Sequence, residues 1–478
     1  MALVDPEHLP NILIIMADDL GPWALHCAET PELITPNIDR IAAEGTRFEN
    51  CFCASPVCSP ARATFLTRRI PSCHGVHDWL RGGNIATDQP QGWSGKDRPI
   101  EYLSGLTGFT DVLAVNGYLC GLSGKWHLGA SHLPQKSHGY WCAYALGGGS
   151  YVNYHFFDNA PELKHSTQYV TDLFTDRALQ FLQTHGNKKQ PFCLSVHYTA
   201  PHSPWIESEQ PPEIWSLYNE SVFSSLPVVP PHPWQGWNPS QEERRRTIQG
   251  YFTTITAMDR AIGRILGTLD ELNIADKTLV IFTSDNGFNV GHHGILGKGN
   301  GTYPLNMYEE SVKVPFVARY PQKIPAGVVR KELISHYDFF PTLLDFLGLE
   351  NPIQDQLPGK SFAPLLRGES GGHETVVVHD EYGPVRMIRD AHWKYIHRFP
   401  CGPHELYNLE EDPRETVNRI QDLSCREVVE QLREKLEQWF RMYALPERDG
   451  ASLPVTGKGQ IDAIGGNKNV RECFMPYK

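Results

Sequence analysis

The chain has 478 residues, of which 40% are hydrophobic and 21% charged, and its formal net charge is −12. This length exceeds the size at which one hydrophobic core keeps growing, so we expect two domains, residues 1–368 and residues 369–478. The acidic balance excludes a general basic surface for nucleic acid. An anionic substrate would therefore need a local concentration of positive charge.

The start of the chain carries no export pattern. Residues 1–10 lack a basic segment, and the apolar run at 12–17 is too short for a signal-peptide core or a membrane span. The 11 cysteines are scattered through a large chain, so we expect reduced thiols. The sequence as written predicts a cytoplasmic protein with no membrane partner, although a trimmed export signal would leave the same pattern. The oligomeric state stays open.

Residues 11–320 alternate between strand and helix patterns. The expected strands are residues 11–17, 118–122, 192–198, 279–283 and 314–320, and the expected helices are residues 34–44, 110–115, 169–182 and 241–266. Ser240 and Glu243 form a capping box at the start of the last helix. The alternation predicts an α/β fold in which helices cover both faces of a large, mostly parallel sheet, with sites outside the carboxyl ends of its strands.

Two other segments break this alternation. Residues 207–239 are rich in proline and tryptophan, and a long irregular segment of this kind is often functional. After Gly368, short strand patterns at 376–378, 385–389 and 393–396 precede a helical pattern at 426–443. We expect a small antiparallel sheet with a packed helix. The tail at 451–478 has no strong period, and we assign it no function.

Polar residues follow two of the expected strands. Asp18 and Asp19 come after the first strand, and Asp285 and Asn286 come after the strand at 279–283. Oxygen ligands of this type suit calcium or magnesium rather than zinc. An isolated acidic doublet more often belongs to a turn, so the residues alone leave both interpretations open.

A thiol precedes an arginine at the start of an expected helix. Cys58 and Arg62 are four residues apart, and Pro60 stiffens the turn between them. A nucleophile at a helix start is favoured by the helix dipole, and an arginine beside it can hold an anion. A cysteine on a turn is nevertheless more often a small buried hydrophobic residue.

Several motifs together resemble the type I sulfatases, members of the alkaline-phosphatase-like superfamily. Cys58, Pro60 and Arg62, followed by residues 66–67, resemble the first family signature, and residues 124–129 resemble the second. Further family blocks are similar to residues 11–21, 200–202, 284–287 and 310–312, in the same order. The family usually has Thr-Gly-Arg where this chain has Thr67-Arg68-Arg69. This departure lies outside the cysteine-proline-arginine core, so we expect modification of the cysteine to survive.

The resemblance implies a nucleophile and a cofactor. In the family, a formylglycine-generating enzyme acts transiently on the cysteine, here Cys58, and oxidises it to an aldehyde. One hydroxyl of the aldehyde hydrate attacks sulfur, and the other, once deprotonated, expels sulfate. The resemblance also implies one calcium ion, with magnesium as the alternative. Its expected ligands are Asp18, Asp19, Asp285 and Asn286.

The resemblance further implies roles for the basic residues. His127 is expected to be the base, Lys125 to bind sulfate and the modified residue, and Arg62 to steady the hydrate. His202 and Lys298 are expected to bind sulfate and help protonate the leaving alcohol. Taken alone, His127 would be a core histidine and Lys298 a solvated loop residue. The residues expected to contact the alcohol portion of the substrate are His293, Trp79 and Arg81, although surface hydrogen bonding explains the last two equally well.

The expected activity is hydrolysis of an O-sulfate ester. A saccharide substrate is suggested by the aromatic, proline-rich segment and the compact C-terminal part. The alternatives are an aryl or choline sulfate, a phosphonate monoester or phosphodiester cleaved by the same site, and a binding protein for sulfated ligands in which Cys58 is never converted.

Overall fold

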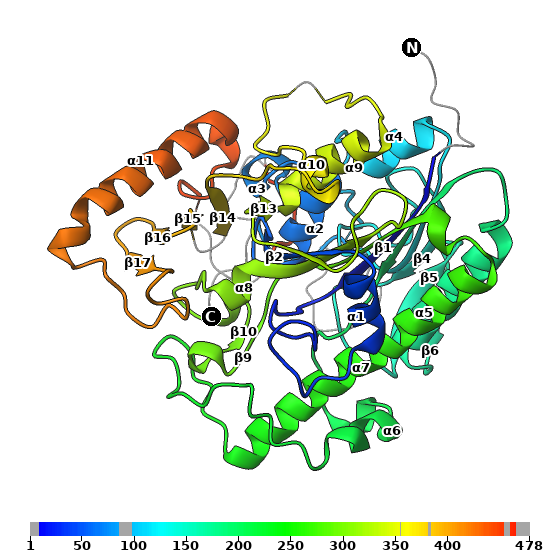
Figure 1. Ribbon diagram of the computed structural model, residues 1–478, viewed down its shortest axis with the longest axis horizontal. Coiled ribbons are helices and arrows are strands. Elements are labelled where there is room, and N and C mark those ends of the chain that lie inside the picture. Colours follow the sequence, from blue (N-terminus) through cyan, green and yellow to red (C-terminus); the bar gives the residue numbers. More distant parts are fainter. Residues whose placement is uncertain (1–8, 86–97, 354, 381–383, 454–458, 465–478) are drawn as a thin grey trace.

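The computed structural model describes residues 9–85, 98–353, 355–380, 384–453 and 459–464. The expectations drawn from residues 1–10 and from the tail at 451–478 fall largely outside this part of the chain. Within it, a large sheet lies between layers of helices, and a smaller sheet is covered by one long helix (Figure 1).

The large sheet is mixed and mostly parallel, as predicted. Its described strands follow the order β12-β2-β11-β8-β1-β7-β3-β4-β5-β6, with β13 paired to β2. The central strands β8, β1, β7 and β3 run parallel, whereas β11 is antiparallel to β8. The strands are β1 (Asn11–Ala17), β2 (Thr46–Phe52), β3 (Leu119–Lys125), β4 (His138–Tyr144), β5 (Tyr154–Asp158), β6 (Lys164–Ser166), β7 (Phe192–His197), β8 (Thr278–Ser284), β11 (Lys313–Arg319), β12 (Val328–Arg330) and β13 (Ile334–Ser335).

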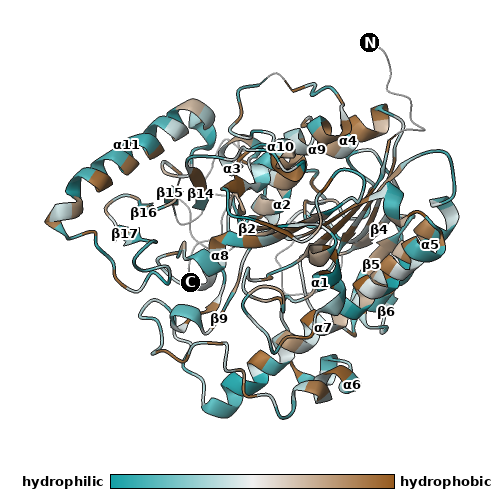
Figure 2. Cartoon of the chain, in the orientation of Figure 1, coloured by the Kyte–Doolittle hydropathy of each residue, from teal (hydrophilic) through white to brown (hydrophobic). Residues whose placement is uncertain are grey.

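The side chains of β1 alternate between two hydrophobic cores, one on each face of the sheet. Ile12 and Ile14 pack with residues of α2, α4 and α9, whereas Leu13 and Ile15 pack with residues of α1, α5 and α7. Figure 2 shows the resulting hydrophobic band along the strands. The helices are α1 (Pro36–Ala43), α2 (Cys58–Thr67), α3 (Pro71–His74), α4 (Phe109–Val115), α5 (Val170–His185), α6 (Pro212–Trp215), α7 (Gln241–Glu271), α8 (Glu309–Val312), α9 (Phe339–Leu347), α10 (Ala363–Leu366) and α11 (Arg426–Tyr443).

The expected strands and helices are all present, with ends shifted by a few residues. The capping box is also confirmed: the Ser240 Oγ accepts from the Glu243 amide at 3.2 Å, and the Glu243 carboxylate accepts from the Ser240 amide at 2.8 Å. β2 and the strands from β4 to β6 were not predicted from the sequence. In β2, polar Arg47, Glu49 and Asn50 interrupt the apolar pattern, and their side chains are only half-buried.

The C-terminal part contains the expected antiparallel sheet and helix. Its strands β14 (Val376–Asp380), β15 (Val385–Arg389), β16 (Trp393–Arg398) and β17 (Glu405–Asn408) pair in chain order. Leu432, Leu436 and Phe440 of α11 pack on the sheet against Ile388 and Tyr395. The fourth strand was not predicted. The domain boundary at 368 stays a prediction.

No helix in the described part of the chain is both long and apolar enough to cross a membrane.

Candidate active site

The candidate site lies at the carboxyl ends of the central strands. Ala17 of β1 pairs with Ser284 of β8, so the following residues, Asp18 and Asp285, leave the sheet side by side. Lys125 is the last residue of β3. Beyond the end of β7, the chain turns through residues 198–201 to His202. The parallel register therefore gathers residues that are up to 267 positions apart in sequence.

Three buried carboxylates form the centre of the site. Oxygen atoms of Asp18, Asp19 and Asp285 lie within 4.8 Å of one another. The amides of Asp19 and Asn286 both donate to Asp285 Oδ1, at 3.2 and 2.8 Å. The Asn286 side chain donates to Asp19 Oδ1 at 2.8 Å. Asn286 thus joins the acidic cluster, and the structure brings together all four residues predicted to bind the cation.

The donor set fits a hard divalent cation. The ligand atoms that Asp18, Asp19, Asp285 and Asn286 offer are all oxygens, and Asn286 Oδ1 is buried without a hydrogen-bond partner among the described residues. A buried carbonyl oxygen beside three carboxylates is a ready ligand. Asp18, Asp19, Asp285 and Asn286 are therefore the residues that would hold the family's metal ion.

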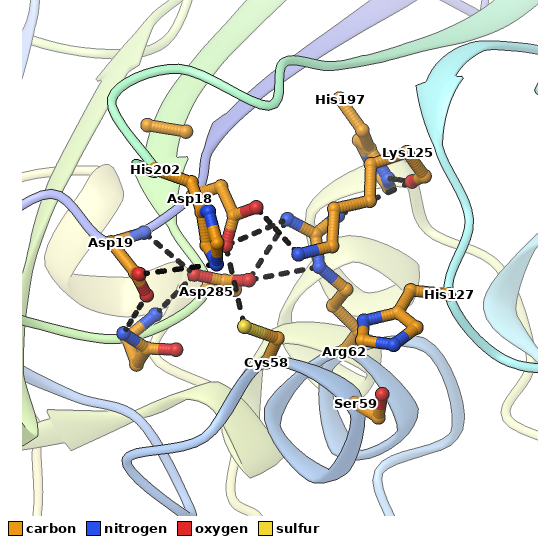
Figure 3. Close-up of polar contacts among 12 residues, drawn as sticks. Asp18, Asp19, Cys58, Ser59, Arg62, Lys125, His127, His197, His202 and Asp285 are labelled. Atoms are coloured by element: carbon orange, nitrogen blue, oxygen red, sulfur yellow. Dashed lines mark hydrogen bonds and ion pairs between the residues drawn. The ribbon is translucent and has the colours of Figure 1, made fainter. Parts of the chain in front are cut away.

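Cys58 is the first residue of α2, and it lies against this cluster (Figure 3). Its Sγ donates to Asp18 Oδ1 at 3.4 Å and accepts from Lys298 Nζ at 2.7 Å. One turn later on the same helix, the guanidinium of Arg62 contacts Asp285 Oδ2 at 2.8 and 2.9 Å. Helix α2 therefore directs both the predicted nucleophile and its arginine at the carboxylates.

Two lysines complete the cationic side of the site. Lys125 Nζ donates to Asp18 Oδ2 at 2.5 Å, and Lys298 Nζ donates to Asp19 Oδ1 at 2.5 Å. Three cationic side chains, with Arg62, thus face three carboxylates. A divalent cation bound to the carboxylates would leave the site net positive, which supplies the local charge that an anionic substrate needs in a protein of net charge −12.

The pKa values of the site follow from burial and from these pairs. Burial raises the pKa of the Cys58 thiol to about 12, helped by Asp18, so the unmodified thiol stays protonated and is a poor nucleophile. Burial also raises the pKa of Asp18, and this effect exceeds the attraction of Lys125. Burial opposes ionisation of Asp285 as well, but Arg62 and the two lysines outweigh it and lower its pKa.

His127 is buried on the Lys125 side of Cys58 (Figure 3). Its Nε2 lies 3.0 Å from the carbonyl oxygen of Leu80, which can only accept, so Nε2 carries the proton. Nδ1 is buried and has no hydrogen-bond partner among the described residues. Burial, together with the Lys125 charge, holds the pKa of His127 well below its usual range. The ring is therefore neutral, with Nδ1 free to accept a proton.

A glycine loop between β4 and β5 leaves room for two histidines. A Cβ atom at Gly147 would lie 2.3 Å from Cε1 of His127, and one at Gly148 would lie 2.9 Å from Cε1 of His202. Any larger residue at these positions would displace the rings. This loop was not predicted from the sequence to belong to the site.

The loop that carries Lys298 is braced by the proline-rich segment. Lys298 lies between β10 (Leu296–Gly297) and a short 3₁₀ turn (Gly299–Gly301). The Gln235 side chain donates to the carbonyls of Leu296 and Gly301, at 2.8 and 2.5 Å, and accepts from the Leu296 amide at 2.7 Å. The irregular segment at 207–239 thus clamps both ends of the lysine loop.

The remaining predicted site residues have mixed placements. His202 Nε2 is 3.7 Å from Asp19 Oδ2, and its side chain is 27% exposed, so it stands at the rim of the cluster. His293 bonds to Glu310 at 2.9 Å and stacks on the Tyr308 ring at 3.8 Å. Trp79 and Arg81 contact the C-terminal segment, where the Trp79 carbonyl and the Arg81 amide bond to the Gln460 backbone.

Comparison with known proteins identifies the class of this site. A family model described as sulfatase matches residues 10–349, and one described as N-sulphoglucosamine sulphohydrolase, C-terminal, matches residues 301–441. An N-acetylglucosamine-6-O-sulfatase from Bacteroides thetaiotaomicron is 27% identical, over 91% of this chain and 87% of the relative. A choline-sulfatase from Rhizobium meliloti is 26% identical, over 86% of this chain and 82% of the relative.

A solved structure agrees with these matches. It holds a protein in complex with its substrate D-glucosamine-2-N,6-O-disulfate and superposes with a TM-score of 0.75, at 25% identity, over 91% of this chain and 98% of that chain. This chain belongs to the sulfatase family, within the alkaline-phosphatase-like superfamily, and is a sulfuric ester hydrolase. Membership implies a formylglycine and a metal ion.

Proposed function

We propose that this protein hydrolyses the sulfate ester of a sulfated saccharide, through a formylglycine formed from Cys58 and with one calcium or magnesium ion. The observation that carries the proposal is the convergence of three carboxylates, one free amide oxygen and three cationic side chains on the residue-58 side chain. The relatives named for amino-sugar 6-sulfates, and the structure with a bound glucosamine disulfate, support the saccharide.

The chain's own residues bind and orient the sulfate. When bound, the metal ion would draw charge from the sulfuryl oxygens, and the formylglycine would supply the attacking hydroxyl. Lys125 and Lys298 point at the space beside residue 58 and would hold the sulfate anion by charge-assisted hydrogen bonds. Arg62, fixed by Asp285, would keep residue 58 in position.

Two histidines have the placement needed for proton transfer. His127 is neutral with its Nδ1 free, so it would accept a proton from the residue-58 hydroxyl that does not carry sulfate. His202 stands at the rim, beside Asp19 and near Lys298, where the leaving alcohol would depart. Together with Lys298 it would donate the proton that the alcohol oxygen needs.

Two measurements test the proposal. Mass spectrometry of the peptide that contains residue 58, from protein made in its own host, should show the aldehyde in place of the thiol. Turnover should then be compared on chromogenic sulfate and phosphonate esters of one alcohol, followed by 6-O-sulfated amino sugars and choline sulfate. An unconverted thiol, or turnover of the phosphonate alone, would refute the mechanism. Preference for choline sulfate would refute only the saccharide assignment.

A further inference from the structure

The C-terminal segment returns to the active site. Gln460 is fully buried and pairs with Leu80 as an isolated parallel β-bridge, 380 positions away in sequence. Its amide donates to the Trp79 carbonyl at 2.9 Å, and its carbonyl accepts from the Arg81 amide at 2.8 Å. The tail, to which the sequence pattern assigned no function, thus adds one strand residue to the segment that follows the nucleophile helix.

The side chain of Gln460 fixes the same segment at a second place. Its Oε1 accepts from the His77 amide at 2.8 Å, and its Nε2 donates to the Gly75 carbonyl at 3.0 Å. Backbone and side chain of Gln460 together therefore hold residues 75–82 at several points. If the Gln460 side chain is removed, the amide of His77 and the carbonyl of Gly75 each lose this hydrogen bond within the protein interior.

The amide and carbonyl of Leu80 point away from Gln460 and toward the active site. In an extended strand the backbone polar groups of successive residues point to alternate sides. Because Trp79 and Arg81 bond to Gln460, the amide and carbonyl of Leu80 lie on the opposite side of the chain. The Leu80 amide donates to Ser59 Oγ at 3.1 Å, and its carbonyl accepts from His127 Nε2 at 3.0 Å. Ser59 directly follows Cys58, and the side chains of Ser59 and His127 appear in Figure 3.

We infer that Gln460 is a positioning residue, which holds the Leu80 peptide so that its carbonyl fixes the orientation and tautomer of His127. This inference rests on the proposed role of His127 as the base. Gln460 touches no reacting atom, and its side chain acts through the backbone of residues 75–81. Without the side-chain bonds to His77 and Gly75, the segment that carries the bridge is no longer held in place, so the Leu80 carbonyl shifts against the His127 ring and the ring loses its fixed tautomer and orientation.

The kinetic test uses full-length Gln460→Ala, measured well below its unfolding temperature, with Gln249→Ala as the matched control. Gln249 is also buried and bonds to the backbone of Trp215 and the side chain of Asn219, none of which belongs to the site. We expect kcat of Gln460→Ala to fall about 10-fold to 100-fold, the range for misplacement of a catalytic group, with KM within about twofold of wild type. Gln249→Ala should keep the wild-type kcat.

Non-additivity separates positioning from general destabilisation. In a His127→Ala background, adding Gln460→Ala should lower kcat by less than about twofold, since the residue through which it acts is gone. An unchanged kcat in the single variant, or the same loss in both backgrounds, would overturn the inference.

A measurement that does not depend on turnover distinguishes failure of this inference from failure of the proposed function. The ¹⁵N shifts of the His127 ring, assigned from the His127→Ala spectrum, should report an Nε2-protonated ring in wild type and mixed tautomers in Gln460→Ala. Identical ring shifts in both proteins would reject the positioning role. An inactive wild type with an unconverted thiol at residue 58 would instead reject the proposed function.

Discussion

The substitution Gly147→Ala tests whether the position of the His127 ring sets the rate. The added methyl would lie 2.3 Å from Cε1 of His127, whereas ordinary contact begins at 3.4 Å. The ring or the loop must therefore retreat by roughly 1 Å, since carbon atoms repel steeply inside van der Waals contact. The backbone at residue 147 is not in the left-handed region, and the three atoms nearest to the added methyl all belong to the His127 ring.

The expected loss follows from this displacement. Misplacement of a catalytic group by about 1 Å costs about 100-fold in rate, equivalent to about 2.7 kcal/mol of transition-state stabilisation. The substitution does not touch Lys125 and Lys298, the residues proposed to bind sulfate, so KM should stay within about threefold of wild type. Overpacking should also lower the free energy of unfolding by about 1–3 kcal/mol.

The assay is steady-state hydrolysis of a chromogenic sulfate ester, corrected for formylglycine content by mass spectrometry and for folded fraction by circular dichroism. Gly139→Ala is the control, because Gly139 is an exposed position in β4 whose added methyl would meet the end of the Leu119 side chain at 3.1 Å and the Cys120 carbonyl oxygen at 4.0 Å. Its kcat should equal wild type. If folded, converted Gly147→Ala keeps kcat within about twofold, the ring position does not limit the reaction.

Three further predictions address the cation, the long helix and a charged pair. Chelation should abolish turnover until calcium or magnesium is restored, and full activity in the presence of chelator would contradict a catalytic cation. Asn286→Ala should raise the cation concentration needed for half-maximal activity about 10-fold to 100-fold. Gly267 lies within α7, and a Cβ atom added there would meet no other side chain or segment within 4 Å. Because alanine favours a helix more than glycine does, Gly267→Ala should raise the free energy of unfolding by about 0.5–1 kcal/mol in urea titration. An unchanged midpoint of unfolding would contradict this prediction. Burial opposes protonation of His293, but the nearby Glu310 carboxylate outweighs burial, and the pKa of His293 is raised. The stabilisation from this pair is therefore complete below about pH 6.5, the usual pKa of histidine, and is lost as pH rises through the raised pKa. The deficit of His293→Gln in unfolding free energy should therefore be largest near pH 6 and shrink toward pH 9; a deficit that grows with pH would contradict the pairing.

Strand ends made much of the site predictable. Asp18 and Asp285 follow short apolar runs of the length typical of buried strands, and a parallel sheet brings the carboxyl ends of such strands to one edge. The register of Ala17 with Ser284 shows how directly this rule operates. The fold class was predictable for the same reason, because the central strands are mostly apolar and almost wholly buried.

The rest of the site depends on groups that the sequence pattern does not reveal. The acceptor for His127 is the backbone carbonyl of Leu80, which any residue would provide. Gln460 lies in a segment without hydrophobic period, and Gln235 lies in an irregular segment whose composition indicates function but no partner. Such contacts follow from the path of the chain in space rather than from local preference. Gly147 and Gly148 are different, because a run of glycines after a strand is a sequence pattern that indicates close packing against the backbone.

The departure at Arg68 illustrates how a local exception is tolerated. Arg68 is the C-cap of α2 and has a φ of 65°, in the left-handed region where glycine is favoured, which explains the glycine that the family usually has there. Its guanidinium donates to the Gly359 carbonyl at 3.1 Å, and this contact offsets part of the backbone strain. Cys58 lies at the opposite end of the helix, so the strain is separated from the proposed nucleophile by the full length of α2. The exception therefore bears on the stability of the helix end and leaves the geometry of the site intact.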